Sequence, residues 1–217
     1  MKKTILFPFL NLFKKNKTLA FYILIFTTIA LGVSFHNYLS GVKEIGGGEY
    51  THYNNYIIFK NSHFNLKNNS DLYSHYNSQW DLYKYSPTFA FLMGGMVYFP
   101  TILGLSVWNI INTILLILGI WHLPKIDFKS KRWMLVLISI ELITSIQNSQ
   151  SNGLIAALLI WTFIFLEKAN AWKANICLAL SVFIKIFGVV LLPIYLFYKF
   201  RVKALATFII ICLAFYR

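Results

Sequence analysis

Long apolar runs flanked by Lys and Arg dominate this chain and restrict it to one class of fold. The first run covers residues 18–38, a second covers 105–123, and further runs follow up to residue 217. An α-helix needs about 20 apolar residues to cross about 30 Å of hydrocarbon. The alternating segments of about ten residues typical of a transmembrane barrel are absent. We therefore expect an all-α, polytopic transmembrane protein with a single membrane domain over residues 1–217.

Composition and charge support this class. Charged residues are 12% of the chain, whereas soluble domains carry about 25%. The net charge of +13 comes mostly from clusters beside the apolar runs, at 14–17, 125–132, 168–173 and 199–203. Such clusters mark cytoplasmic helix ends, so the charge indicates membrane topology and no nucleic-acid partner. We expect a multi-pass protein of the cell membrane with a cytoplasmic N-terminus. Residues 1–17 are expected to form a basic amphipathic lead before the first apolar run.

A polar stretch at 46–87 separates the first apolar run from the others and makes up most of an expected external loop at 39–85. Inside it, 52–66 predicts a helix with Tyr56, Phe59, His63 and Leu66 on one face. A helix of this kind suits the membrane interface. Three successive glycines at 46–48 predict a flexible break before it.

The apolar segment 86–99 leaves the topology open between two alternatives. Fourteen residues reach roughly 21 Å as an α-helix, less than the hydrocarbon thickness. If this segment crosses fully, the basic loop 125–132 falls outside, against the positive-inside rule. If it is re-entrant, that loop falls inside, and the run 174–198 must go out and return with Lys185 near its outer tip. We favour the re-entrant alternative, so residues 86–217 hold both transmembrane and re-entrant helices.

Three groups of side chains could carry chemistry. The loop acids Glu49, Asp71 and Asp81 could serve as a general base towards a hydroxyl, or simply as solvated acids and helix caps. Lys84, beside Ser86 and Pro87 at the mouth of a short helix, could hold an anionic headgroup. Polar groups at membrane depth are functional candidates, here Glu141, residues 147–152 and Lys185.

Alternative interpretations accompany these candidates. Glu141 could pair with Lys185 as a structural ion pair, and the amides of 147–152 could cap the two helix ends that they join. The loop histidines at 52, 63 and 75 are spaced eleven and twelve residues apart, unlike zinc motifs. The sequence therefore predicts no metal site, and it carries no nucleotide-binding motif or cofactor signature.

In their order and spacing, several short motifs resemble glycosyltransferase family 87, over about residues 49–203. The loop contributes Asn55-Tyr56 with Phe59, then Asp71-Leu72-Tyr73 and Tyr85-Ser86-Pro87. Trp108-Asn109 and Asn112 follow in the next run, and residues 147–152 are similar to the family's Gly-Gln-x-Asn region, with Ser149 in place of Gly. Phe183-Ile184-Lys185 resembles its membrane lysine segment.

The resemblance implies a GT-C type fold and a hexosyltransferase that is mannosyltransferase-like, so that mannose is the expected sugar. A polyprenyl-phosphate-sugar would be the donor, in the lipid bilayer, and a cell-envelope glycan or glycolipid would be the acceptor. Catalytic candidates are Glu49 and Asn55. The substrate-binding candidates are Asp71, Tyr73, Lys84, Tyr85, Ser86, Gln147, Asn148, Gln150, Asn152 and Lys185.

The chain departs from the family pattern at its expected base. Counting back from Asp71-Leu72-Tyr73, the family's loop aspartate falls on Asn55, and an amide cannot act as a general base. Either Glu49 replaces it, or the protein is a degenerate membrane subunit without transfer activity. The end of the sequence within an apolar run suggests a fragment that is inactive alone. A transporter or flippase is the alternative function, because Glu141, Lys185 and the broken segments are also typical of transporters.

Overall fold

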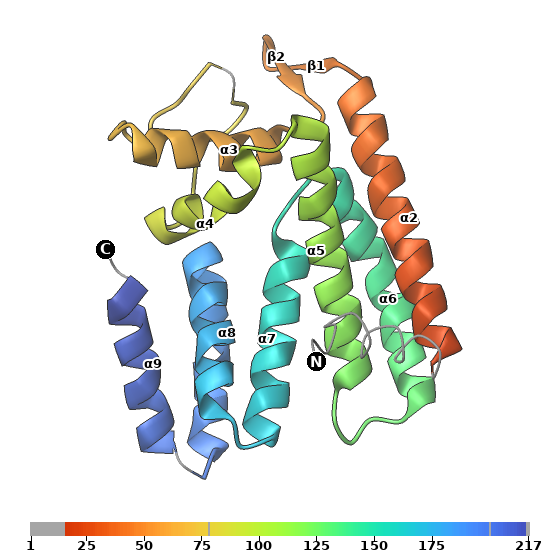
Figure 1. The fold of residues 1–217 in the computed structure, drawn as a ribbon, viewed down its shortest axis with the longest axis vertical. Coiled ribbons are helices and arrows are strands. Elements are labelled where there is room, and N and C mark those ends of the chain that lie inside the picture. Colours follow the sequence, from red (N-terminus) through yellow and green to blue (C-terminus); the bar gives the residue numbers. More distant parts are fainter. Residues whose placement is uncertain (1–15, 78, 200, 216–217) are drawn as a thin grey trace, which may run out of the picture.

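The computed structural model describes residues 16–77, 79–199 and 201–215, and most of these residues are helical (Figure 1). The expected all-α class is confirmed, with one small β-hairpin added to it. Most of the predicted lead at 1–17 lies outside the described residues. In chain order the elements are α2 (Lys17–Leu39), β1 (Val42–Ile45), β2 (Gly48–Thr51), α3 (Asn54–Lys67), α4 (Pro87–Val97), α5 (Thr101–His122), α6 (Phe128–Gln147), α7 (Asn152–Glu167), α8 (Ala171–Ile184), the 3₁₀ helix η1 (Ile186–Phe197) and α9 (Arg201–Phe215).

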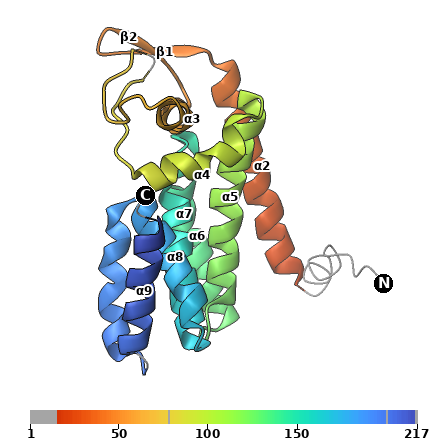
Figure 2. The ribbon, with the colours of Figure 1, turned by 60° about the vertical axis from the view of Figure 1, so that its left-hand side comes forward.

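The long helices run side by side, while α3 and α4 lie across the upper end of this bundle (Figures 1 and 2). Helix α5 packs against α2 and α7, α7 packs against α8, and α8 packs against η1 and α9. Two described helices, α2 and α5, are long and apolar enough to cross a membrane, and α4, α7, α8 and η1 are shorter apolar helices.

The turns that carry basic residues gather at the lower end of the bundle in Figure 1. The α5–α6 loop, the α7–α8 turn and the start of α9 all lie there, and Lys125 forms an ion pair with Glu167 at 2.6 Å. The α6–α7 turn lies at the opposite end. Helix α4 does not run through the bundle, and the chain reverses between α8 and η1 at Lys185. The reversal at Lys185 falls where the re-entrant alternative places a turn, and how these helices lie in a membrane stays a prediction.

The glycine-rich segment is an ordered turn, so the predicted flexible break is wrong. Gly46 and Gly47 have φ values of +59° and +81°, which is the left-handed pair that a two-residue type I′ hairpin turn requires. Strands β1 and β2 pair in antiparallel register, with Lys43 opposite Tyr50 and Glu44 opposite Glu49. Because strand side chains alternate between faces, Lys43 is half-buried whereas Glu44 and Glu49 are exposed.

Helix α3 begins two residues later than predicted, because Tyr53 occupies its N-cap position. Tyr56 and Phe59 from its apolar face are fully buried. The Phe59 ring meets the rings of Phe89 and Trp108 edge to face, at 5.2 and 5.5 Å between centroids. These contacts fix α3 above α4 and α5.

The α6–α7 turn receives hydrogen bonds from three other helices. The backbone oxygens of residues 147, 148 and 149 accept from Asn37 Nδ2, Asn55 Nδ2 and Trp108 Nε1, at 2.8, 2.8 and 3.0 Å. The Asn112 Oδ1 atom accepts from the backbone N–H of Leu154 at 2.8 Å. The last carbonyls of a helix have no partner within it, so these bonds satisfy the end of α6 and attach it to α2, α3 and α5.

We predict that Trp108→Phe destabilises the fold by about 1–3 kcal/mol, because a buried carbonyl loses its donor while the aromatic ring is kept. Trp172→Phe is the matched control, since Trp172 is 58% exposed, and we expect little change from it. Denaturant titration of both variants in detergent micelles measures the difference. Equal stability of the two variants would contradict an anchoring role for the Trp108 hydrogen bond.

Candidate functional site

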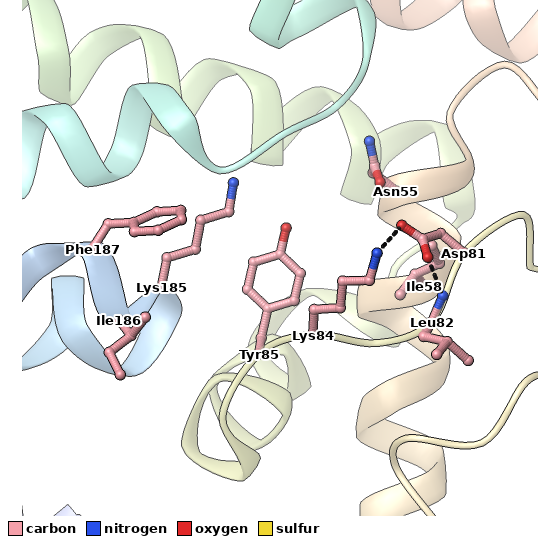
Figure 3. A pocket seen from close by; sticks show the side chains of 9 residues that line it. All are labelled: Asn55, Ile58, Asp81, Leu82, Lys84, Tyr85, Lys185, Ile186 and Phe187. Carbon is pink, nitrogen blue, oxygen red and sulfur yellow. Dashed lines mark hydrogen bonds and ion pairs between the residues drawn. The ribbon is translucent and has the colours of Figure 1, made fainter.

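A cavity of about 280 Å³ lies where α3, the segment 79–86 and the α8–η1 break meet (Figure 3). We call it the donor cavity, after the role that we propose for it below. Side chains that are distant in sequence converge on it, with one carboxylate, two lysines and an amide among apolar neighbours. Its lining residues are Asn55, Ile58, Asp81, Leu82, Lys84, Tyr85, Lys185, Ile186 and Phe187.

Lys185 stands at the tip where α8 ends and η1 begins. Its backbone is extended, with φ −143° and ψ 133°, so the helical path is broken at this residue. Its Nζ atom donates to Asn152 Oδ1 at 2.8 Å and lies 5.7 Å from the centroid of the Tyr85 ring. The predicted pairing with Glu141 is therefore wrong: Glu141 is exposed on α6, and the partner of Lys185 is an amide.

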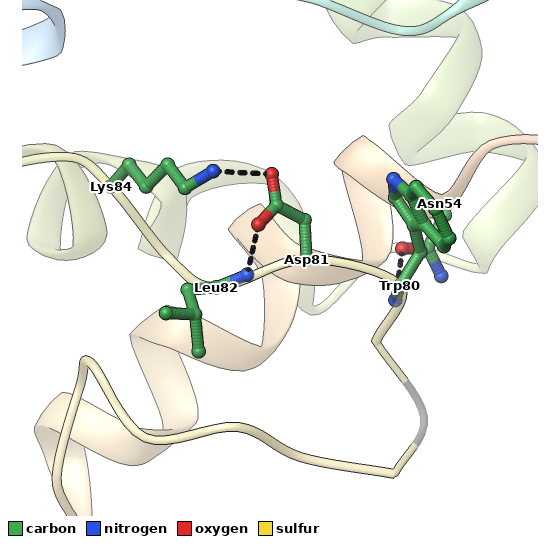
Figure 4. A network of polar contacts seen from close by, with 5 residues as sticks. All are labelled: Asn54, Trp80, Asp81, Leu82 and Lys84. Atoms are coloured by element: carbon green, nitrogen blue, oxygen red, sulfur yellow. Dashed lines mark hydrogen bonds and ion pairs between the residues drawn. The ribbon is translucent and has the colours of Figure 1, made fainter. Parts of the chain in front are cut away.

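Asp81 and Lys84 form an ion pair at the mouth of the donor cavity (Figures 3 and 4). Lys84 Nζ donates to Asp81 Oδ2 at 2.6 Å, and the backbone N–H of Leu82 donates to Asp81 Oδ1 at 2.8 Å. The bond from Lys84 holds the pKa of Asp81 below its usual range, and the Leu82 amide adds to this effect. Asp81 is therefore an ionised carboxylate with a cation beside it.

Asn55 is held by the α6–α7 turn. Its Nδ2 atom donates to Asn148 O at 2.8 Å, and a carboxylate in its place could not donate this bond. Figure 3 shows its side chain next to that of Asp81. The Asn55 amide thus has a positional role, and a carboxylate stands beside it from another part of the loop.

Glu49 does not line the donor cavity. It lies on the exposed face of the hairpin, opposite Glu44, because a strand sends alternate residues to opposite faces. Asp71 lines none of the cavities described here either: it is exposed and accepts hydrogen bonds from Tyr73 N at 3.0 Å and from the Ser74 hydroxyl. Those two bonds lower the pKa of Asp71, that from Ser74 most.

Two other predicted loop residues make structural hydrogen bonds. Ser86 is the N-cap of α4: its Oγ accepts from Phe89 N at 3.1 Å and donates to Phe183 O at 2.6 Å, which ties α4 to the end of α8. The Tyr73 hydroxyl donates to Tyr85 O at 3.3 Å. Both bonds position the segment that carries Lys84 and Tyr85.

Two further cavities adjoin the α6–α7 turn. A middle cavity of about 240 Å³ shares Asn55 and Asp81 with the donor cavity. An α2 cavity of about 430 Å³ lies beyond it, beside α2. The polar residues predicted in this turn are divided among them: Asn148 lines both, Gln147 lines the α2 cavity, and Gln150 lines the middle cavity. Asn152 Nδ2 donates to Gln150 Oε1 at 2.7 Å, so Asn152 links Gln150 to Lys185.

The model of glycosyltransferase family 87 matches residues 83–216. The chain belongs to glycosyltransferase family 87. The matched range holds Lys84, Tyr85, the α6–α7 turn and Lys185, whereas the hairpin, α3 and Asp81 precede it. Comparison with curated proteins and with solved structures gives no match. Family membership identifies a glycosyltransferase.

We predict that Lys84→Met raises the pKa of Asp81, because the carboxylate loses the cation and the hydrogen bond that stabilise its charged form. The measurement is the pH dependence of the carboxyl ¹³C shift of Asp81 in aspartate-labelled protein, assigned with Asp81→Asn. Lys67→Met is the control, because Lys67 is the last residue of α3, at the opposite end from Asn55, and donates to Tyr98. A midpoint that stays in place or falls in Lys84→Met would contradict the pairing.

Proposed function

We propose that this glycosyltransferase moves a sugar from a polyprenyl-phosphate donor to a glycan or glycolipid acceptor of the cell envelope, at the outer face of the cell membrane. Mannose is the sugar that the resemblance implies. The observation that carries the proposal is the donor cavity, which combines the Asp81 carboxylate with Lys84 and Lys185 beside exposed apolar side chains. Activation by lipid phosphate also accounts for a chain without a nucleotide-binding motif.

The outer surface of the bundle supports a membrane location. Large apolar side chains are exposed on it, including Leu137 at 75%, Ile140 at 77% and Phe197 at 89%. A soluble monomer seldom exposes extended apolar surface, whereas a bilayer would cover these side chains. With the basic turns on the cytoplasmic side, the donor cavity faces the outer leaflet.

The donor cavity suits a lipid phosphate. Ile186 and Phe187 are 73% and 71% exposed at its edge, where an isoprenoid chain could pack. Lys185 lies next to them, and its hydrogen-bond partner is the neutral amide of Asn152, with no carboxylate in ion-pair contact among the residues that the structure describes. A phosphate at this point would receive charge-assisted hydrogen bonds from Lys185 and from Lys84, which are stronger than neutral ones.

The residues of the cavity can divide the reaction between them. Asp81 takes the proton from an acceptor hydroxyl as its oxygen attacks the anomeric carbon of the donor sugar. The bond from that carbon to the phosphate oxygen breaks, and its electron pair leaves with the lipid phosphate. Lys84 and Lys185 stabilise the negative charge that develops there. Attraction of Lys84 to the donor phosphate would also weaken its bond to Asp81 and make Asp81 a better base.

We predict that Asp81→Asn lowers kcat for sugar transfer by about 10²–10⁴-fold, as loss of a general base does. Glu49→Gln and Asp71→Asn are matched controls, and both should retain transfer, because these acids lie outside the donor cavity. The assay follows radiolabelled sugar from polyprenyl-phosphate-mannose into acceptor by the full-length protein in proteoliposomes. Full activity of Asp81→Asn would exclude Asp81 as the base, and loss in Glu49→Gln would restore Glu49. No transfer from several lipid-linked sugars would contradict the proposed function.

We predict that Lys185→Met raises the KM for the lipid donor roughly 10–100-fold, the effect of losing one hydrogen bond from a charged group. Lys173→Met is the control, since Lys173 follows the turn at the opposite end of α8. Initial rates over a range of donor concentrations give both constants. An unchanged KM in Lys185→Met would remove Lys185 from the donor site.

A further inference from the structure

A further cavity lies at the basic end of the bundle, away from the donor cavity. It is bordered by the α7–α8 turn, the end of η1 and the start of α9, and the turn and the start of α9 lie at the lower end of the bundle in Figure 1. Its volume of about 380 Å³ falls within the range of about 300–1,000 Å³ that ligand pockets occupy. We call it the basal cavity, and its lining residues include Ala169, Trp172, Tyr198, Lys203 and Thr207.

One buried amide ties the walls of the basal cavity together. Asn175 is fully buried on α8. Its Nδ2 atom donates to Ala204 O on α9 at 2.8 Å, and its Oδ1 atom accepts from the Tyr195 hydroxyl on η1 at 2.6 Å. A buried polar network whose members have partners specifies one arrangement of the groups that it joins. The three helices that border the cavity are therefore fixed relative to one another.

Lys203 gives the basal cavity a positive charge that the protein does not neutralise. Lys203 is exposed, and its ammonium group makes no hydrogen bond or ion pair with any residue that the structure describes. The sequence from 168 to 217 contains no Asp or Glu. Glu167, which comes just before this range, forms its ion pair with Lys125 at 2.6 Å. An anion in the cavity would therefore meet Lys203 with no carboxylate in the lining to oppose it.

The surroundings of the basal cavity suit a lipid better than a soluble anion. Trp172, which is 58% exposed, and Tyr198 line it, and these residue types are enriched where a bilayer meets water. Beyond Lys203 the outer face of α9 is apolar, with Ile209 and Leu213 exposed by 56% and 67%. Acyl chains could pack on this face while their headgroup lies at the lysine. Basic pockets between membrane helices on the cytoplasmic side bind anionic headgroups in this way.

We propose that the basal cavity binds an anionic phospholipid of the cytoplasmic leaflet. The phosphate lies at Lys203, the glycerol backbone lies against Trp172, and the acyl chains follow α9. The bound lipid bridges α8, η1 and α9, and so stabilises the helical hairpin of α8 and η1 whose tip carries Lys185. The proposal uses the membrane location of the proposed function and is independent of sugar transfer.

The test measures binding of phosphatidylglycerol, and of phosphatidylcholine with the same acyl chains, to the full-length protein in dodecyl maltoside micelles by native mass spectrometry. We expect wild type to bind phosphatidylglycerol roughly fivefold more tightly, the contribution of one basic residue to the attraction of an anionic lipid. Lys203→Met should remove this preference, and Lys203→Arg should keep it. Lys168→Met is the matched control and should keep it too, because Lys168 is exposed at the same end of the bundle but does not line the cavity.

Two outcomes of this measurement would overturn the proposal. Equal losses in Lys203→Met and Lys168→Met would show an attraction that is spread over the basic surface, without a site. Equal binding of the two lipids by wild type would show that the cavity does not select an anion.

Two further arms locate the lipid and identify its source. Phosphatidylglycerol should shift the fluorescence of Trp172, measured as the difference between wild type and Trp172→Phe. The absence of this shift would place the lipid elsewhere and overturn the proposal. Glycerol phosphate and poly-glutamate are soluble competitors, and neither should displace the lipid at an equal concentration. Displacement by either would show that the cavity takes a soluble anion, and would overturn the lipid assignment.

The outcomes also separate this proposal from the proposed function, because none of these arms requires catalysis. A protein that binds phosphatidylglycerol through Lys203 but transfers no sugar would contradict the proposed function alone. A protein that transfers sugar but shows no lipid preference would contradict the basal cavity alone.

Discussion

Three side chains from three helices donate to three successive carbonyls of the α6–α7 turn, and this set of bonds determines where the polar end of the molecule is assembled. The carbonyls would otherwise end α6 without partners. Asn55 joins α3 to the turn, so the helix that carries one wall of the donor cavity is fixed relative to the bundle. Asn152, at the start of α7, then holds Lys185 from the other side. The cavity is therefore built around one turn, with no strand or compact loop domain as its frame.

The start of the family match, at residue 83, separates two groups of cavity-lining residues. The matched residues 83–216 supply Lys84, Lys185 and the apolar edge at Ile186 and Phe187. The preceding residues supply the hairpin, Trp80 and Asp81, which border the middle cavity. In the proposed reaction the first set handles the lipid phosphate and the second handles the incoming hydroxyl. A family with a common donor and different acceptors would require this division.

The all-α class and the reversal at Lys185 could be predicted from the sequence, whereas the surroundings of the candidate acids could not. Hydropathy and the positions of Lys and Arg predict the arrangement of turns and the reversal at Lys185, because both depend on local residue type. Local residue type did not indicate which loop acid lines the donor cavity. Glu49 is close to Asn55 in sequence, but the hairpin turn at Gly46 and Gly47 and the strand alternation direct it outward. Asp81 comes close to Asn55 only because the loop folds back on itself. In the same way, the hydrogen bond from Asn55 to Asn148 joins residues that are 93 positions apart in the chain.

The 3₁₀ geometry of η1 determines how far this segment reaches along α8. Helix α8 has 14 residues and η1 has 12. At about 1.5 Å per residue α8 is roughly 21 Å long, and at about 2.0 Å per residue η1 is roughly 24 Å long. As an α-helix, η1 would reach only roughly 18 Å and would fall short of the far end of α8. The extended winding of η1 thus lets its 12 residues run the full length of α8, so that Lys185 stays at one end of this hairpin while η1 reaches the other end.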